Sequence, residues 1–202
     1  MKFRLAIGAA MFAALPVQAD LLGLTVASHL AQTNTDPKAS SAWQGDIEVR
    51  FKHPIPLIPN VAVGANKRKQ GDAADGSSYQ GELYYNLFDT AGLYLDLGAG
   101  YESWDSADSF LAGTDSGEQV YAVGRVAWRF PGSNLGLESD LKLSLTDEDY
   151  KANRFRAGVN YELFDLVAST IDISAGYQYE DIATRSYSTS DSGAYLGLAV
   201  NF

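Results

Sequence analysis

The chain has 202 residues, contains no cysteine and carries a formal net charge of −10 at pH 7. The missing cysteines exclude disulfides and thiolate metal centres, and the acidic balance argues against nucleic acid binding because it offers no basic surface to phosphates. The length suits one domain, and no stretch resembles an interdomain linker.

The first residues have the organisation of a secretory signal. Lys2 and Arg4 give a positive start, Leu5 to Leu15 form an apolar run, and Val17-Gln18-Ala19 resembles a small-x-small cleavage site. We therefore predict a signal peptide over residues 1–19 and a mature domain over 20–202. No later segment has the roughly 18 unbroken apolar residues of a transmembrane helix, so a membrane location would require a closed barrel.

Segments of alternating polarity fill the remaining chain, and period-two alternation is typical of strands with two different faces. Four proline- or phenylalanine-containing turns, at 53–60, 88–92, 131–134 and 164–170, separate some of them. Polar connections rich in Asp, Ser, Thr and Gly separate the others. In chain order the predicted strands are 20–31, 46–52, 61–70, 79–87, 93–104, 117–130, 135–145, 154–163, 171–180 and 192–202.

An even strand count with polar connections after odd strands and turns after even strands is typical of bacterial outer-membrane barrels. We therefore predict an all-β fold, a ten-stranded antiparallel transmembrane β-barrel of the outer-membrane type with both termini in the periplasm. Aromatic residues are expected to form two girdles, with Phe51, Phe88, Phe130, Phe164 and Phe202 on the turn side and Trp43, Tyr79, Trp104, Tyr150 and Tyr187 on the loop side.

One motif occurs twice with the same spacing. Tyr85-Asn86-Leu87-Phe88-Asp89 recurs as Tyr161-Glu162-Leu163-Phe164-Asp165, and the segments that follow, 95–101 and 171–177, also match each other. The repetition predicts two hairpins of similar construction, each with a turn that begins at its phenylalanine.

The chain ends in an alternating strand whose apolar face finishes on an aromatic residue. This ending resembles the C-terminal signal that outer-membrane barrels present to their assembly machinery, and its expected residues are Leu196, Leu198, Val200 and Phe202. The predicted partners are outer-membrane lipid, lipopolysaccharide and, during biogenesis, the barrel assembly machinery.

Two further motifs carry a family resemblance. The start Ala19-Asp20-Leu21-Leu22-Gly23-Leu24 and the turn His53-Pro54-Ile55-Pro56-Leu57-Ile58-Pro59-Asn60, with the Phe202 end, resemble uncharacterised outer-membrane proteins of Gram-negative bacteria. That family is found alongside the GlyGly-CTERM/rhombosortase sorting system. The resemblance implies an outer-membrane barrel and supplies no activity and no catalytic residues.

A soluble β-sandwich or a lipid-binding barrel would also alternate, with its polar face in water. Here that face often holds glycine beside charges of both signs, as at Gly98, Gly100, Gly158 and Gly176. A narrow lumen needs small residues beside paired charges, whereas a solvated face needs neither. The pattern therefore favours the membrane barrel.

The polar faces predict a charged lumen. Its acidic members are Asp46, Glu48, Glu82, Asp96, Glu102, Glu138, Asp140, Glu162, Asp172 and Glu180, and its basic members are Arg50, Lys52, Arg68, Arg125, Arg129, Lys142, Arg154 and Arg156. Barrels of about eight strands are filled by side chains, and buried charges must pair. We expect a structural or envelope role with a plugged lumen; the alternative is a narrow, low-conductance pore for ions or small solutes.

An omptin-like surface enzyme is the less favoured alternative. His29 is the single candidate base, near the outer end of the first strand, with Asp172 or Glu180 as possible partners across the barrel closure. Such a histidine is usually a hydrogen-bonded filler, so we expect no enzyme, no catalytic residues and no cofactor.

The predicted loops hold many acidic residues, the densest group being Thr146-Asp147-Glu148-Asp149-Tyr150. Carboxylates bind hard cations such as Ca²⁺ or Mg²⁺, but the spacing is not that of an EF-hand. We expect these loop acids to be solvated and predict no metal site; the group is Asp72, Asp75, Asp105, Asp108, Asp115, Asp147, Glu148, Asp149, Asp181 and Asp191.

Overall fold

A computed structural model describes residues 23–35, 41–55, 57–69, 76–90, 92–106, 116–146, 150–166, 169–184 and 188–202. The predicted signal peptide, 1–19, and Tyr187 lie outside the described residues. No helix in the described ranges is long and apolar enough to cross a membrane.

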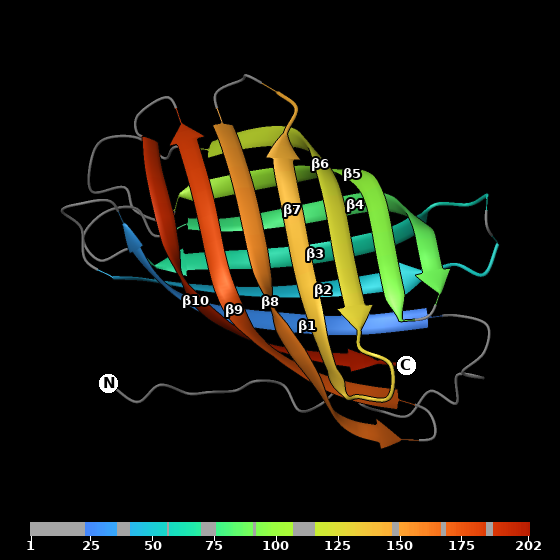
Figure 1. Cartoon of the computed structure of the whole chain (residues 1–202). Coiled ribbons are helices and arrows are strands. Elements are labelled where there is room, and N and C mark those ends of the chain that lie inside the picture. Colours follow the sequence, from blue (N-terminus) through green and yellow to red (C-terminus); the bar gives the residue numbers. More distant parts are fainter. Residues whose placement is uncertain are drawn as a thin grey trace, which may run out of the picture.

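The described residues form one closed antiparallel barrel, in which each strand pairs with its neighbours in the sequence and the first pairs with the last (Figure 1). The strands are β1 (Gly23–Thr35), β2 (Ala42–Lys52), β3 (Asn60–Lys69), β4 (Gly76–Thr90), β5 (Leu93–Ser106), β6 (Ser116–Arg129), β7 (Leu135–Ser144), β8 (Tyr150–Leu166), β9 (Ser169–Thr184) and β10 (Ser188–Asn201).

The barrel closes between β1 and β10, where Thr25 to Thr35 pair with Asn201 to Asp191. Beyond the last ladder pair, the Phe202 N–H donates to the Leu24 carbonyl at 2.8 Å and the Leu24 N–H donates to the Phe202 carbonyl at 3.3 Å. Because the barrel is closed, it has no edge strand, and the backbone N–H and C=O groups form their hydrogen bonds between strands without water. This confirms the predicted ten-stranded antiparallel barrel.

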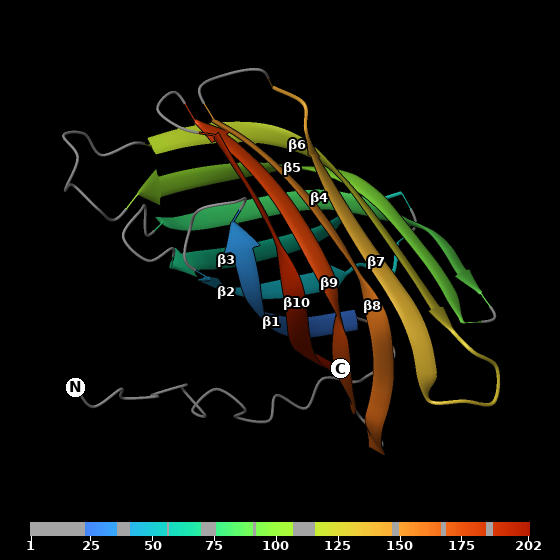
Figure 2. The ribbon, with the colours of Figure 1, turned by 60° about the vertical axis from the view of Figure 1, so that its left-hand side comes forward.

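The two ends of the barrel differ in what they carry (Figures 1 and 2). Residues 23 and 202 lie at one end, together with the connections β2–β3, β4–β5, β6–β7 and β8–β9, and we name it the turn end. The opposite end, which carries the connections after the odd strands, is the loop end. At the turn end, Gly92 and Gly132 have positive φ angles of 79° and 73°, which glycine adopts without steric cost.

The repeated motif builds a β-bulge in each of two strands, not the start of a turn. The register shifts between Asn86 and Phe88 in β4 and between Glu162 and Phe164 in β8. Each strand then continues, to Thr90 and to Leu166, so the predicted turns at 88–92 and 164–170 begin too early. A bulge absorbs one extra residue and lets pairing continue.

The outer wall of the barrel is apolar. Leu97 is 46% exposed, Val63 54% and Leu198 47%, and each lies inside its strand and not at either end. A water-soluble barrel turns such residues inward, whereas an outer-membrane barrel turns them to lipid. Trp43 and Tyr79 also point outward near the loop end, as the predicted girdle requires.

Two aromatic residues predicted for the loop-side girdle instead point into the barrel. Trp104 and Tyr150 are 5% and 2% exposed. Trp104 shares the inner face of β5 with Glu102, because residues two apart in a strand point the same way. The girdle prediction is therefore wrong for these two residues.

Candidate functional site

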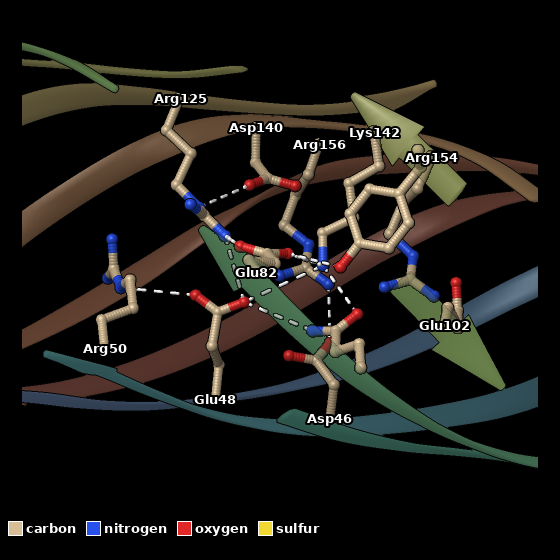
Figure 3. Close-up of polar contacts among 12 residues, drawn as sticks. Asp46, Glu48, Arg50, Glu82, Glu102, Arg125, Asp140, Lys142, Arg154 and Arg156 are labelled. Atoms are coloured by element: carbon tan, nitrogen blue, oxygen red, sulfur yellow. Dashed lines mark hydrogen bonds and ion pairs between the residues drawn. The ribbon is translucent and has the colours of Figure 1, made fainter. Parts of the chain in front are cut away.

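The inner face of the barrel is the candidate site, and every lumen charge predicted from the sequence points into it or borders it. At its centre, Glu48 and Glu82 lie between Arg125 and Lys142, with Asp140 beside them (Figure 3). We call these five residues the central cluster. They come from four strands, so the cluster ties β2, β4, β6 and β7 across the lumen.

The central cluster pairs each buried cation with more than one carboxylate. Arg125 bonds Glu82, lies 3.3 Å from Glu48 Oε2 through Nη2, and reaches Asp140 Oδ2 at 3.1 Å through Nε. Lys142 Nζ lies 2.9 Å from Glu82 Oε1 and 3.8 Å from Glu48 Oε2. Multiple pairing is required here because an unpaired charge in a low-dielectric interior costs several kcal/mol.

Aromatic residues and Arg50 complete the surroundings of the central cluster. The Tyr121 hydroxyl donates to Glu82 Oε1 at 2.8 Å, and Arg50 Nε lies 3.3 Å from Glu48 Oε1. The Arg125 guanidinium lies 5.5 Å from the centre of the Tyr84 ring, and Lys142 Nζ 5.3 Å from that of Tyr121. These cation–π contacts give Arg125 and Lys142 an attractive interaction in addition to their ion pairs.

A second polar layer fills the half of the lumen toward the loop end. Arg154 donates to Glu180 Oε1 from Nε at 2.9 Å and from Nη2 at 2.5 Å, and Gln44 donates to Glu180 Oε2 at 2.8 Å. Gln178 bonds Gln44 in turn, and it is 0% exposed while Glu180 is 2% exposed. We call these four residues the loop-half layer; their side chains occupy the space that a channel would need.

One prediction about the loop acids is wrong in this half. Asp191, expected to be solvated, is 1% exposed and pairs with Arg68. It lies inside because β10 begins at Ser188, earlier than the predicted 192, and its inner face therefore includes position 191. The acidic residues 147–149 lie outside the described residues.

A small apolar group lies inside the barrel near the loop end. Trp104 and Tyr150 stack with ring centres 5.5 Å apart and planes 5° from parallel, and they pack with Ala152 and Ile182. We call these four residues the apolar cap. Gln119 joins the cap to Glu102, because its Oε1 accepts from the Ala152 N–H at 2.9 Å and its Nε2 donates to Glu102 Oε2 at 2.8 Å.

The other half of the lumen contains a cavity of about 500 Å³, which we call the vestibule. Gly23, Lys52 and Phe202 border it at the turn end, and His29, Asp46, Arg125 and Lys142 line its inner part. The central cluster therefore forms its floor. The interior is filled toward the loop end and hollow toward the turn end.

The predicted charges around the vestibule are also paired. Arg129 bonds Glu162 and lies 3.3 Å from Asp172 Oδ1. Two further carboxylates at the vestibule have neutral partners. Asp96 accepts from Asn86 at 2.7 Å, and Glu138 accepts from the Tyr195 hydroxyl at 2.8 Å. Arg129 is 41% exposed at its side chain, so water reaches this group.

The structure assigns His29 a different place and partner from those predicted. His29 Nδ1 lies 2.8 Å from Asp46 Oδ1 on the neighbouring strand, and Arg156 donates to Asp46 Oδ2 at 2.6 Å. Asp172 pairs with Arg129, and Glu180 with Arg154. His29 faces the vestibule at the middle of β1, away from the loop end.

Sequence reasoning missed the neutral members of the network. Tyr121 and Tyr195 are 0% and 2% exposed and hold carboxylates, and Gln44 and Gln178 connect the loop-half layer. These residues lie an even number of positions from charged residues of the same strands, which places them on the inner face. This spacing could have identified them from the sequence. In the described parts of the chain, no group of three or more His, Asp or Glu residues is arranged to hold a metal ion.

No family model matches the sequence, and no curated protein matches it. Among solved structures, the β domain of the Bordetella autotransporter BrkA matches with a TM-score of 0.51 at 10% identity, over 91% of this chain and 99% of that chain. The outer-membrane protease OmpT from Escherichia coli matches at 0.46 and 10% identity, over 94% and 99%. Neisserial surface protein A matches at 0.38 and 14%, over 90% and 97%. The chain has the outer-membrane β-barrel fold.

Proposed function

We propose that this protein is an integral outer-membrane barrel with a structural role in the cell envelope and a lumen that does not conduct. The loop-half layer carries the proposal, because its paired side chains are almost completely buried. The apolar cap lies at the same end and adds a second obstacle to ions. Side chains fill the interior of small barrels, whereas aqueous channels are typical of barrels nearer sixteen strands.

A narrow pore is the second candidate function, and the vestibule favours it. It is hollow, and charges of both signs line it. It leads, however, to the central cluster and then to the loop-half layer, in which Glu180 and Gln178 are nearly inaccessible. A blind vestibule is consistent with the structural role.

The proposed setting follows from the outer wall and the two ends. Apolar side chains on the wall face lipid, the turn end with residues 23 and 202 faces the periplasm, and the loop end meets lipopolysaccharide. Leu196, Leu198 and Phe202 are proposed to contact the assembly machinery during insertion; Leu196 is 67% exposed on the outer wall. The family resemblance and the GlyGly-CTERM association remain predictions from the sequence.

Single-channel recording of the refolded protein in a planar bilayer tests the proposal. We expect no conductance steps from the wild type, and none from Arg125→Ala, since the loop-half layer stays in place. Steady, ion-selective steps that change with Arg125→Ala would show that ions pass the central cluster, and the pore would replace the structural role.

A further inference from the structure

Four neighbouring strands place an acid, a base and a hydroxyl in one row on the inner wall. Asp46 of β2 pairs with His29 of β1, His29 pairs with Gly197 of β10, and Gly197 pairs with Ser174 of β9. All of them except Gly197 line the vestibule. The row therefore joins residues far apart in the chain across the closure of the barrel.

Gly197 lets the base and the hydroxyl approach each other. A Cβ built on Gly197 would lie 2.7 Å from His29 Cδ2 and 3.2 Å from His29 Nε2, and closer still to Ser174 Oγ. Both side chains thus lean over the strand that separates them. Any larger residue at 197 would collide with both side chains.

The histidine is oriented for the role of a base. Its Nδ1 faces Asp46 Oδ1 at 2.8 Å, so a proton on Nδ1 leaves Nε2, on the Ser174 side, free to accept. Arg156 donates to the other Asp46 oxygen at 2.6 Å and holds that carboxylate in place. Acid, base and hydroxyl in this order are the arrangement that activates a serine nucleophile.

We propose that Ser174 is a nucleophile activated by His29, with Asp46 as the positioning residue, and that this site hydrolyses small polar carboxylic esters that enter the vestibule. The proposal departs from the sequence expectation that the chain is not an enzyme, and it adds an activity to the structural role. The cavity of about 500 Å³ has the size of a small-molecule site. Its charged lining favours a short, polar acyl donor over a long-chain lipid.

The reaction needs only water as co-reactant. Ser174 Oγ attacks the ester carbonyl carbon as its proton passes to His29 Nε2, and the leaving alkoxide takes that proton when its bond to the carbon breaks. Water then loses a proton to His29 Nε2 and attacks the acyl group. The bond to Ser174 Oγ breaks, Oγ regains the proton, and the carboxylic acid leaves.

Tyr195 adjoins the proposed nucleophile. Its ring meets that of His29 edge-on with centres 5.8 Å apart, and its hydroxyl hydrogen-bonds Ser174 and donates to Glu138 at 2.8 Å. Since Tyr195 uses its own proton on Glu138, Ser174 donates to Tyr195 or to His29 Nε2 by rotation of its hydroxyl. We therefore expect slow acylation.

A fluorophosphonate probe tests the proposal, because it forms a covalent adduct with activated serines. The refolded wild type is incubated with the probe, and adducts are located by peptide mass spectrometry. Ser28 lies beside His29 on the outer wall of β1 and serves as the reference serine. We expect an adduct on Ser174 that forms at least ten times faster than any on Ser28.

Three variants check the assigned roles in barrels whose folding is verified by their heat-modifiable gel mobility. Ser174→Ala should abolish the adduct and p-nitrophenyl acetate hydrolysis, and His29→Gln should slow labelling at least tenfold. Asp46→Asn should lower the maximal labelling rate without changing the apparent affinity for the probe. Ser28→Ala should match the wild type.

Absence of a Ser174 adduct in the wild type would overturn the proposal without any variant, as would labelling that His29→Gln leaves unchanged. These outcomes are distinct from those of the conductance test. A non-conducting barrel without a Ser174 adduct retains the structural role and loses the activity.

Discussion

Arg125 is the cation of the central cluster that pairs with the most carboxylates. It is 8% exposed and faces Glu48, Glu82 and Asp140 from three other strands. Removing one member of a buried ionic group is costly because the charges that remain are still desolvated. Arg129 also faces two carboxylates, but its side chain is 41% exposed, and water can solvate what it leaves behind.

Arg125→Ala should therefore destabilise the barrel by about 3–5 kcal/mol, whereas Arg129→Ala should cost about 1 kcal/mol or less. Urea unfolding of both variants in lipid vesicles, followed by tryptophan fluorescence, measures the difference. Equal losses of stability would contradict the distinction between the buried central cluster and the water-accessible Arg129 group at the vestibule.

At the scale of the strand, the two bulges each absorb one residue. In β8, Glu162 pairs with Asp172 and Phe164 pairs with Ile171, so Leu163 has no ladder partner of its own. Leu163 and Phe164 are 40% and 58% exposed and both lie on the outer wall. Pairing on either side of the bulge would continue without Leu163.

Deleting Leu163 should leave a folded barrel, because Glu162 keeps its place inside and Phe164 keeps its place outside. Deleting Val159, four residues earlier in the same strand, should prevent folding, since a shift of one residue exchanges the two faces of the strand. The folded fraction after refolding, measured by heat-modifiable gel mobility, compares the two deletions. A misfolded Leu163 deletion would contradict the assigned bulge.

The strands were predictable from sequence because lipid and lumen impose opposite polarity on alternate residues. The same parity placed Glu102 and Arg125 inside. It could not assign partners: His29 meets Asp46, and not Asp172 or Glu180, because ladder register depends on hydrogen bonding through whole strands. The aromatic girdle prediction failed at Trp104, where a large ring fills the lumen beside Tyr150.

For the whole molecule, the apolar wall should respond to charge according to depth. Leu97 is the fifth residue of β5, inside the strand on the outer wall and 46% exposed, whereas Leu145 follows the end of β7 at the loop end and is 62% exposed. We expect Leu97→Arg to cost about 2–4 kcal/mol and Leu145→Arg about 0–1 kcal/mol. Unfolding in lipid vesicles checks this, and similar losses at both positions would argue against a lipid-facing wall.

We conclude that the lumen is filled toward the loop end and hollow toward the turn end. Thr25 and Thr33 test it on one strand and one face: Thr25 lines the vestibule, and Thr33 is 1% exposed beyond the central cluster. The chain has no cysteine, so a single introduced thiol has no background.

The most direct measurement is the rate at which a charged maleimide modifies Thr25→Cys and Thr33→Cys in the folded, detergent-solubilised barrel. We predict that Thr25→Cys is modified at least a hundred times faster than Thr33→Cys, with both thiols equally reactive after unfolding. Comparable rates in the folded barrel would mean that solvent traverses the lumen and would contradict a filled loop half.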